Sequence, residues 1–297
     1  MSHRPLREQV IVITGASSGI GLATARAAAD EGARLVLAAR SEDTLQEVCE
    51  QLSRQGGEAV AVSADVSVRA DVQRIADAAI ARFGRIDTWV NDAAVSIYGH
   101  LENVSDEDSR RLFDVNFWGV VHGSLVALPH LRASRGALVN LGSEVSEAVV
   151  PLQGMYAASK HAVKGFTDAL RVEVEDVEQS HVTITLIQPT AVDTPFPQHA
   201  RNYMPQEPKL PTPQLDPDDV AHAILKAAEH GGRDIKVGTM ARLNAAASKL
   251  MGSAADKTAA MQAGRQQYDE PPRDPAGTLY RPGHAGQERG SGGTVRH

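Results

Sequence analysis

An α/β fold, with a doubly wound parallel sheet flanked by helices, is what the sequence predicts for most of the chain. Three observations carry this prediction. Strand-like and helix-like segments alternate with short connections. A glycine-rich turn separates the first strand from the first helix. Polar or turn-forming residues recur where the predicted strands end, and the carboxyl ends of parallel strands share one edge of a sheet.

The first strand and its turn occupy residues 10–21, which read Val-Ile-Val-Ile-Thr-Gly-Ala-Ser-Ser-Gly-Ile-Gly. A buried strand, a tight turn and a helix open a nucleotide-binding βαβ unit of the Rossmann type. Gly15 allows the sharp turn, Gly19 lets the backbone approach a diphosphate, and Gly21 lets the helix pack against the strand. The spacing differs from the G-x-G-x-x-G fingerprint. A flexible glycine-serine loop is the alternative interpretation of this stretch taken alone.

The remaining elements follow the same alternation. Runs rich in apolar and β-branched residues predict strands at 9–13, 33–39, 59–62, 86–90, 136–141, 182–187 and 234–238. Helix-compatible runs predict helices at 20–30, 42–55, 68–83, 105–132, 155–179, 217–229 and 240–262. Ser105 and Asp216 are the expected N-caps of two of these helices. The features expected together at the strand ends are Thr14-Gly15, Arg40, Asp65, Asn91, Ser143 and Pro189.

Composition divides the chain into a single domain with extensions. Residues 1–7 are polar and expected to be flexible, and residues 8–239 form the nucleotide-binding domain. Within it, residues 190–216 are rich in Pro, Gln and Thr, which fits either a substrate lid or a plain surface loop. We expect residues 240–268 to form a helical extension. The tail at residues 269–297 is expected to be disordered or draped on the surface.

Charge and composition exclude several classes of protein. The net charge of -7 argues against a nucleic-acid partner. The one cysteine, Cys49, has no adjacent base and is expected to be a quiet thiol. No apolar run approaches a membrane span, and the first residues lack a signal-peptide core, so we expect a cytoplasmic protein. The histidines show no pair at metal-ligand spacing, and no metal site is expected.

Four motifs stand in order along the chain: the glycine turn at residues 14–21, Asn91-Asp92-Ala93-Ala94, Ser143, and Tyr156-Ala-Ala-Ser-Lys160. Together they resemble the short-chain dehydrogenase/reductase family over roughly residues 8–238. The resemblance implies hydride transfer between a nicotinamide cofactor and a small carbonyl or secondary alcohol. It also implies a homodimer or homotetramer formed through the helices at 105–132 and 155–179.

The catalytic prediction centres on Tyr156 and Lys160, which lie one turn apart on a predicted helix and therefore share a face. A neighbouring ammonium is expected to lower the pKa of the phenol from its usual value of about 10. Tyr156 then acts as general acid or base, while Ser143 donates a hydrogen bond to the reacting oxygen. By resemblance, Lys160 also holds the nicotinamide ribose and Asn116 supports a water-linked proton relay. The alternative for Tyr156 is an ordinary amphipathic tyrosine, and the alternative for Asn116 is a polar helix residue without a catalytic role.

NADP(H) is the predicted cofactor in preference to NAD(H). NAD-selective sites often place a carboxylate after the second strand, where this chain has Arg40. Arg40 would attract a 2′-phosphate and Ser17 would add a hydrogen bond; a solvent-facing Arg40 is the alternative. The resemblance implies adenine contacts at Asp65-Val66 and a carboxamide contact at Thr194. The predicted cofactor-binding residues are Gly15, Ser17, Ser18, Gly19, Ile20, Gly21, Arg40, Asp65, Val66, Asn91, Ala93, Tyr156, Lys160, Pro189, Thr190 and Thr194.

The sequence departs from the family pattern at two glycines, where it has Ala94 and Thr190. Glu144 adds a charge beside the site, which either favours a polar or cationic substrate or is solvated at the rim. The substrate wall is expected to be apolar, which leaves steroids, keto-acyl groups and small carbonyls open. Two other functions remain open: an NADP-sensing protein without turnover, and a non-redox epimerase or dehydratase. The expected wall residues are Val145, Val149, Leu152, Met155 and Phe196.

Overall fold

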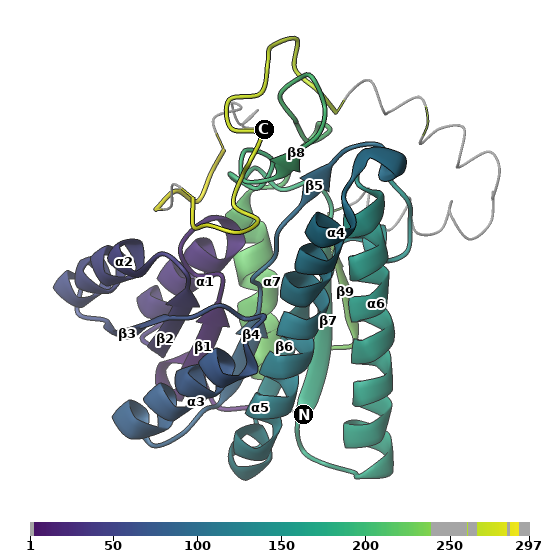
Figure 1. The fold of residues 1–297 in the computed structure, drawn as a ribbon. Helices are drawn as coiled ribbons and strands as arrows, with labels where there is room; N and C mark the ends of the chain where they lie inside the picture. Colours follow the sequence, from purple (N-terminus) through teal and green to yellow (C-terminus); the bar gives the residue numbers. More distant parts are fainter. Residues whose placement is uncertain (1–2, 239–259, 261–265, 284–285, 291–297) are drawn as a thin grey trace.

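The computed structural model describes residues 3–238, 260, 266–283 and 286–290. Within these residues a parallel sheet of seven strands runs in the order β3-β2-β1-β4-β6-β7-β9, with helices on both faces (Figure 1). A small second sheet pairs β5 with β8. The strands are β1 (Val10–Thr14), β2 (Arg34–Ala39), β3 (Glu58–Ser63), β4 (Thr88–Asn91), β5 (Ile97–Tyr98), β6 (Ala137–Leu141), β7 (Thr183–Pro189), β8 (Arg201–Asn202) and β9 (Asp234–Val237). The α-helices are α1 (Gly19–Asp30), α2 (Glu42–Arg54), α3 (Arg69–Phe83), α4 (Asp106–Phe113), α5 (Gly119–Ser134), α6 (Gly154–Arg171) and α7 (Pro217–His230). The predicted fold class is confirmed.

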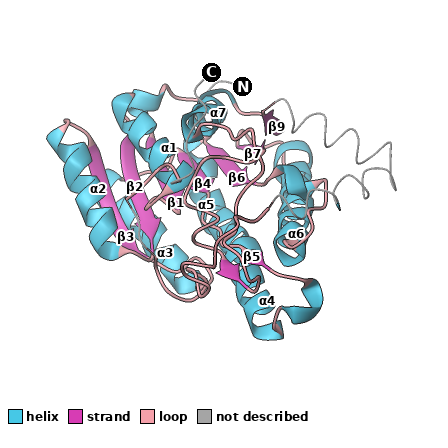
Figure 2. Cartoon of the chain, turned by 90° about the horizontal axis from the view of Figure 1, so that it is seen from above, coloured by secondary structure: helices cyan, strands magenta, loops and turns pink. Residues whose placement is uncertain are grey.

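The sheet is buried on both faces because helices cover each side, as the view along it shows (Figure 2). Successive side chains of a strand point to opposite faces. In β1, Ile11 and Ile13 therefore join the apolar core that also contains residues of α1, α2 and α7. Val12, between them, joins the core built with α3, α5 and α6. Such two-sided burial explains why β1 is apolar throughout rather than alternating.

The strand order reverses direction between β1 and β4, and this fixes the place of the site. The chain first builds β1, β2 and β3 outward, then crosses to lay down β4, β6, β7 and β9 on the other side. Crevices outside the carboxyl ends of strands at such a switch point are where ligands bind in parallel sheets. The loops after β1, β4, β6 and β7 meet there.

The two long helices expected from the sequence are each interrupted. Residues 105–132 form α4, a π-helical turn at Asp114–Trp118, and α5. Residues 155–179 form α6, which passes into a π-helical segment at Val172–Val177. Helix-compatible composition does not distinguish α from π geometry, and π-turns occur frequently at functional sites. Both predicted N-caps are confirmed: Ser105 accepts the Asp108 N–H at 3.1 Å, and Asp216 accepts the Asp218 N–H at 3.0 Å.

The proline-rich segment at 190–216 holds one strand that its composition did not predict. In that segment β8 pairs with β5, and the Arg201 N–H donates to the carbonyl of Ser96 at 2.9 Å. Residues 3–7, expected to be flexible, pack against α7: the His3 N–H donates to the carbonyl of Glu229, and Leu6 is buried. The helix expected at 240–262 lies almost entirely outside the described residues.

Residues 266–283 and 286–290, which we call the C-terminal strap, lie above the carboxyl ends of the strands (Figure 1). They cross the loops that surround the crevice. In the described part of the chain, no helix combines the length and apolar character needed to cross a membrane.

Candidate active site

A cavity of about 520 Å³ opens at the carboxyl edge of the sheet, within the size range of small-molecule sites. It is surrounded by the loops after β1, β2, β3, β4, β6 and β7, together with α6 and the strap. The predicted site residues that line it are Gly15, Ser17, Ser18, Gly19, Ile20, Arg40, Asp65, Val66, Ala93, Ser143, Tyr156, Lys160, Pro189, Thr190 and Thr194.

Three predicted site residues do not line the cavity. Gly21 lies behind the turn, where a Cβ would overlap the carbonyl of Gly15, so its lack of a side chain serves the packing of α1. Asn91 is buried; its amide donates to Asn140 Oδ1 at 2.8 Å and its oxygen accepts from Trp89 Nε1 at 2.8 Å. These contacts tie β4 to β6 and hold the loop that carries Ala93.

Asn116, the third, is fully buried in the π-helical turn. Its Oδ1 accepts the Val95 N–H at 2.8 Å, and its Nδ2 donates to the Val95 carbonyl at 2.9 Å and to Ser159 Oγ at 3.1 Å. The Ser159 hydroxyl donates in turn to the carbonyl of Tyr156 at 2.7 Å. The side chain of Asn116 therefore joins the loop after β4 to the first turns of α6.

The glycine turn after β1 needs glycine at two positions. Gly15 has φ +76°, and a Cβ there would lie 2.9 Å from the backbone of Ala93. Gly19 has φ +54°, and its Cβ would lie 3.3 Å from the Thr194 side chain. α1 begins at Gly19, so its N-terminal N–H groups and the positive end of its dipole lie at the cavity. This arrangement favours an anion.

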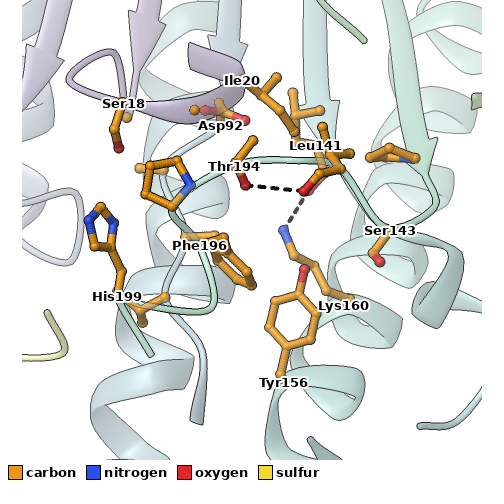
Figure 3. A pocket seen from close by; sticks show the side chains of 18 of the residues that line it. Ser18, Ile20, Asp92, Leu141, Ser143, Tyr156, Lys160, Thr194, Phe196 and His199 are labelled. Carbon is orange, nitrogen blue, oxygen red and sulfur yellow. Dashed lines mark hydrogen bonds between the residues drawn. The ribbon is translucent and has the colours of Figure 1, made fainter. Parts of the chain in front are cut away.

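Tyr156 and Lys160 occupy one face of α6, as predicted, and both point into the cavity (Figure 3). The Lys160 Nζ lies 5.8 Å from the centroid of the Tyr156 ring and donates to the carbonyl of Leu141 at 2.8 Å. Ser143, which follows β6, hydrogen-bonds the Tyr156 hydroxyl. A phenol, an alcohol and an ammonium thus meet where β6 ends.

The predicted lowering of the Tyr156 pKa is wrong for this structure. Burial raises the pKa of the phenol above its ordinary value, and the charges of Asp92 and Glu144 add to that effect. The hydrogen bond from Ser143 opposes it without cancelling it. Burial also lowers the pKa of Lys160 to about 8, against the attraction of Asp92. Burial, and not the neighbouring ammonium that the sequence argument invoked, therefore dominates the pKa of Tyr156.

Asp92 is a site residue that the sequence reasoning missed. It follows β4, lines the cavity and accepts the N–H of Gly21 at the start of α1. Burial raises the pKa of its carboxyl to about 7, while Lys160 and that N–H favour the charged form. The available signal was an acid in the turn directly after a strand, at the edge where the other candidates gather.

The adenosine end of the predicted cofactor site contains two arginines. Arg40 donates from Nη2 to the carbonyl of Thr278 at 2.5 Å and from Nη1 to that of Leu279 at 3.2 Å. Arg111 pairs with Asp65 at 2.5 Å and also donates to the Leu279 carbonyl. Arg40 is therefore held against the strap rather than facing solvent.

The substrate end of the cavity agrees with the prediction at three of five residues. Val145, Val149 and Phe196 line it, and the Phe196 ring lies 5.4 Å from that of Tyr156 between centroids. Leu152 and Met155 do not line it. Leu152 stands in a turn with φ +66° whose carbonyl accepts the Gly99 N–H, and Met155 packs against the core on the α3 and α6 side of the sheet.

Polar groups that the sequence did not predict also lie at the substrate end. Gln153 and Gln266 line the cavity and share a hydrogen bond of 2.9 Å. Gln266 comes from the strap, more than a hundred residues later in the chain, so no local pattern could place it beside Gln153.

Comparisons with known sequences agree with this geometry. The family described as short chain dehydrogenase matches residues 9–204. An uncharacterised oxidoreductase of Bacillus subtilis is 44% identical over 293 residues, which cover 97% of this chain and 82% of that protein. An 11-beta-hydroxysteroid dehydrogenase A of Sesamum indicum is 39% identical over 232 residues, covering 76% of this chain and 67% of that protein.

Solved structures give the same result. A short chain dehydrogenase/reductase from Burkholderia phymatum in complex with NAD matches with a TM-score of 0.75 and 30% identity, covering 83% of this chain and 96% of that chain. An alcohol dehydrogenase from Thermococcus sibiricus complexed with 5-hydroxy-NADP matches with a TM-score of 0.67 and 30% identity, covering 77% of this chain and 94% of that chain.

The raised pKa of Asp92 leads to an expected pH dependence of stability. Because the pKa rises from 3.8 to about 7 on folding, the protonated carboxyl favours the folded state, and this contribution is lost as the pH rises towards 7. Asp92→Asn stays neutral, so its stability relative to the wild type should increase by about 1–3 kcal/mol between pH 5 and pH 8. Urea unfolding at both pH values measures this. The exposed Asp43→Asn is the control, and an equal change in both variants would contradict the assignment.

Proposed function

We propose a specific reaction for this chain, which belongs to the short-chain dehydrogenase family. The protein is accordingly an oxidoreductase that acts on CH–OH groups with a nicotinamide dinucleotide. We propose further that it interconverts a carbonyl and a secondary alcohol with NADP(H), using Tyr156 as general acid or base. The observation that carries the proposal is the meeting of Tyr156, Lys160 and Ser143 in one cavity with the glycine turn.

The residues present fit such a cofactor. Gly15 packs closely against the Ala93 backbone and Gly19 against the Thr194 side chain, so a side chain at either position would disrupt the turn. The turn leads directly into the N-terminus of α1. The positive end of the α1 dipole and the Ile20 N–H would hold the diphosphate, since the Gly19 N–H donates to the carbonyl of Gln287 and the Gly21 N–H to Asp92. Arg40 would hold a 2′-phosphate, and Lys160 the ribose at the nicotinamide end.

The proposed mechanism uses three side chains. When bound, the nicotinamide supplies a hydride to the carbonyl carbon or accepts one from the alcohol. Ser143 donates a hydrogen bond to the substrate oxygen and so fixes it beside the Tyr156 hydroxyl. Tyr156 gives its proton to that oxygen during reduction and takes it back during oxidation. Lys160 is an ammonium below about pH 8 and stabilises the negative charge left on Tyr156.

Asn116 enters the proposal as a positioning residue. Its side-chain amide already bonds Val95 and Ser159, so its contribution is to hold the loop after β4 and the start of α6 at a fixed separation. The water-linked relay that the family resemblance implies for Asn116 stays a prediction.

The substrate end of the cavity supports a mainly apolar carbonyl or alcohol. Val145, Val149 and Phe196 give it apolar walls beside the Tyr156 hydroxyl. The amides of Gln153 and Gln266 offer hydrogen bonds to one polar group further along the same substrate. The name of the Sesamum indicum relative is in keeping with a substrate of this kind.

The charges at the adenosine end support NADP(H) over NAD(H). Arg40 is the residue after β2, where a carboxylate would select NAD. Burial lowers the pKa of Arg40 and the charge of Asp65 opposes that shift, but this carboxylate is already paired with Arg111 and accepts a hydrogen bond from Ser67. A guanidinium has five N–H donors, and the strap carbonyls engage two of its groups, which leaves donors for a phosphate.

Assembly through α5 and α6 is the proposed oligomeric arrangement. Large apolar side chains are exposed on and beside these helices: Leu125, Trp118, Val172 and Val177. Trp118 is 48% exposed and packs edge-on against Phe117, which in turn contacts Phe166 of α6. We propose that these exposed side chains form one apolar patch, which would be typical of a protein interface.

Tyr156→Phe tests the catalytic role. The variant keeps the ring and loses the proton donor, so kcat for reduction should fall by at least about a thousandfold while NADPH still binds. NADPH consumption is measured against a panel of aldehydes, ketones and quinones, with nicotinamide fluorescence for binding. Tyr203→Phe, whose hydroxyl bonds Asp108 away from the cavity, is the control. A near-normal kcat in Tyr156→Phe would exclude it as the acid. Tight dinucleotide retention without any redox change across the panel would indicate a non-redox reaction instead.

Arg40→Asp tests cofactor choice. A carboxylate in place of the guanidinium repels the 2′-phosphate, so the Kd for NADPH should rise by about 10- to 100-fold more than the Kd for NADH. Fluorescence titration measures both constants, and Arg40→Lys, which keeps the charge without the planar fork, should lie between the wild type and Arg40→Asp. Because Arg40 also holds the strap, the part of the affinity loss that is common to NADPH and NADH measures the loss of that contact. If the whole loss of affinity is the same for both dinucleotides, selection for the phosphate is contradicted.

Trp118→Glu tests the interface. A carboxylate buried in an apolar contact is unfavourable, so the variant should dissociate to a smaller species by light scattering after size-exclusion chromatography. Val68→Glu, at an apolar position that is 46% exposed beside α3, is the matched control and should leave the mass unchanged. Equal masses for wild type and Trp118→Glu would place the interface elsewhere.

A further inference from the structure

The C-terminal strap is attached to three parts of the cavity rim. The first is the proline-rich segment at 190–216. The Lys209 N–H donates to the Gln266 carbonyl, the Tyr268 N–H donates to the Glu207 carbonyl, and the Thr278 N–H donates to the His199 carbonyl. These contacts attach the strap to the proline-rich segment at 190–216 that borders the substrate end.

The second fastening lies at the adenosine end of the cavity. Arg40 and Arg111, from separate elements, both donate to the carbonyl of Leu279. The Leu279 side chain is fully buried and belongs to the apolar cluster that contains Val66 and Val115. The buried Leu279 side chain and the two arginine hydrogen bonds to its carbonyl therefore anchor the middle of the strap.

The third fastening is on the glycine turn itself. The Gly286 N–H donates to the Ser17 carbonyl at 2.7 Å, and the Gly19 N–H donates to the Gln287 carbonyl at 2.9 Å. Glu288 then forms an ion pair of 2.6 Å with Arg26, which lies on α1. The strap thus bonds the segment that leads into the N-terminus of α1.

The strap lines one side of the cavity and takes up one donor of the glycine turn, the Gly19 N–H. Thr278, Pro282 and Gly283 line the same 520 Å³ space as Ser17 and Arg40. The cavity is therefore bounded by the sheet edge below and by the strap above. A dinucleotide whose diphosphate lay at α1 and whose adenosine lay near Arg40 would be under the strap.

From these contacts we infer that residues 278–279 and 286–288 are part of the cofactor site: they cover the adenosine half of the dinucleotide and retain it, so the strap must detach before the cofactor leaves. This inference rests on the proposed function. The strap is suited to such opening because it is held by backbone hydrogen bonds, ion pairs and the fully buried Leu279, while Arg281, Pro282 and Gly283 are exposed. Segments held in this way open at low cost compared with the core.

The test measures the dissociation rate of NADPH in the full-length protein, by stopped-flow displacement with excess NADP⁺. Leu279→Ala removes the buried anchor and should raise the rate by at least about tenfold. Glu288→Ala and Arg26→Ala break one ion pair from its two sides, and each should raise the rate by about two- to fivefold. If that pair acts as one unit, the double variant should be no faster than the faster single variant. Arg281→Ala, an exposed change in the same strap, is the control and should leave the rate unchanged.

A fragment locates the effect. The compound 2′,5′-ADP contains the adenosine half alone, so its affinity should fall in Leu279→Ala and Glu288→Ala if the strap covers that half. Thermal unfolding checks that each variant is folded, and the two ion-pair variants test the inference should Leu279→Ala fail that check. NADPH release at the wild-type rate in folded Glu288→Ala and Arg26→Ala would overturn the strap's role while leaving the proposed function intact. A wild-type protein that binds no nicotinamide dinucleotide would overturn the proposed function and the inference together.

Discussion

The chemistry proposed for this protein depends on keeping the Lys160 ammonium charged in a buried position. Lys160 is buried, and burial lowers its pKa to about 8 even though the charge of Asp92 opposes the shift. Two neighbours oppose the loss of charge: the carbonyl of Leu141, which accepts its hydrogen bond, and the carboxyl of Asp92, which attracts it. The same carboxyl has a pKa raised to about 7, so both groups titrate close to physiological pH. Each therefore depends on the other for its charge.

That balance gives Tyr156 a preferred role. With its pKa raised by burial, the phenol is neutral and holds a proton ready for a substrate oxygen. It would act as a base only if further positive charge entered the cavity, because Asp92 and Glu144 both oppose the phenolate. Under the proposed mechanism this neutral phenol is a proton donor, which favours carbonyl reduction.

The parts of the site that sequence reasoning predicted are those set by local patterns. Gly15 and Gly19 are needed by a turn, and Tyr156 and Lys160 share a helix face because of helical periodicity. The fold follows for the same reason, since alternating strands and helices leave few topologies. The pKa of Tyr156 did not follow, because the sequence records which charges are present but not how far water is excluded from them.

The strap could not be found from local patterns at all. Its composition, rich in Pro, Gly and charged residues, is typical of disorder. Its contacts join residues far apart in the chain, such as Arg40 and Thr278, which are 238 positions apart. These contacts are backbone hydrogen bonds, side-chain hydrogen bonds and ion pairs, none of which leaves a periodic signal in the sequence. Only the buried Leu279 is an apolar anchor, and one leucine in a polar tail predicts nothing by itself.

In the proposed site, Arg40 links cofactor choice to cofactor retention. Its guanidinium holds two strap carbonyls and has further N–H donors that would meet a 2′-phosphate. A phosphate oxygen carries negative charge, and its hydrogen bond to a guanidinium is stronger than that of a neutral acceptor. A phosphorylated dinucleotide would therefore take up the remaining donors while the strap contacts stay in place, whereas one without the phosphate would leave those donors unused. In this proposal, selection at the adenosine end and closure of the strap depend on the same side chain.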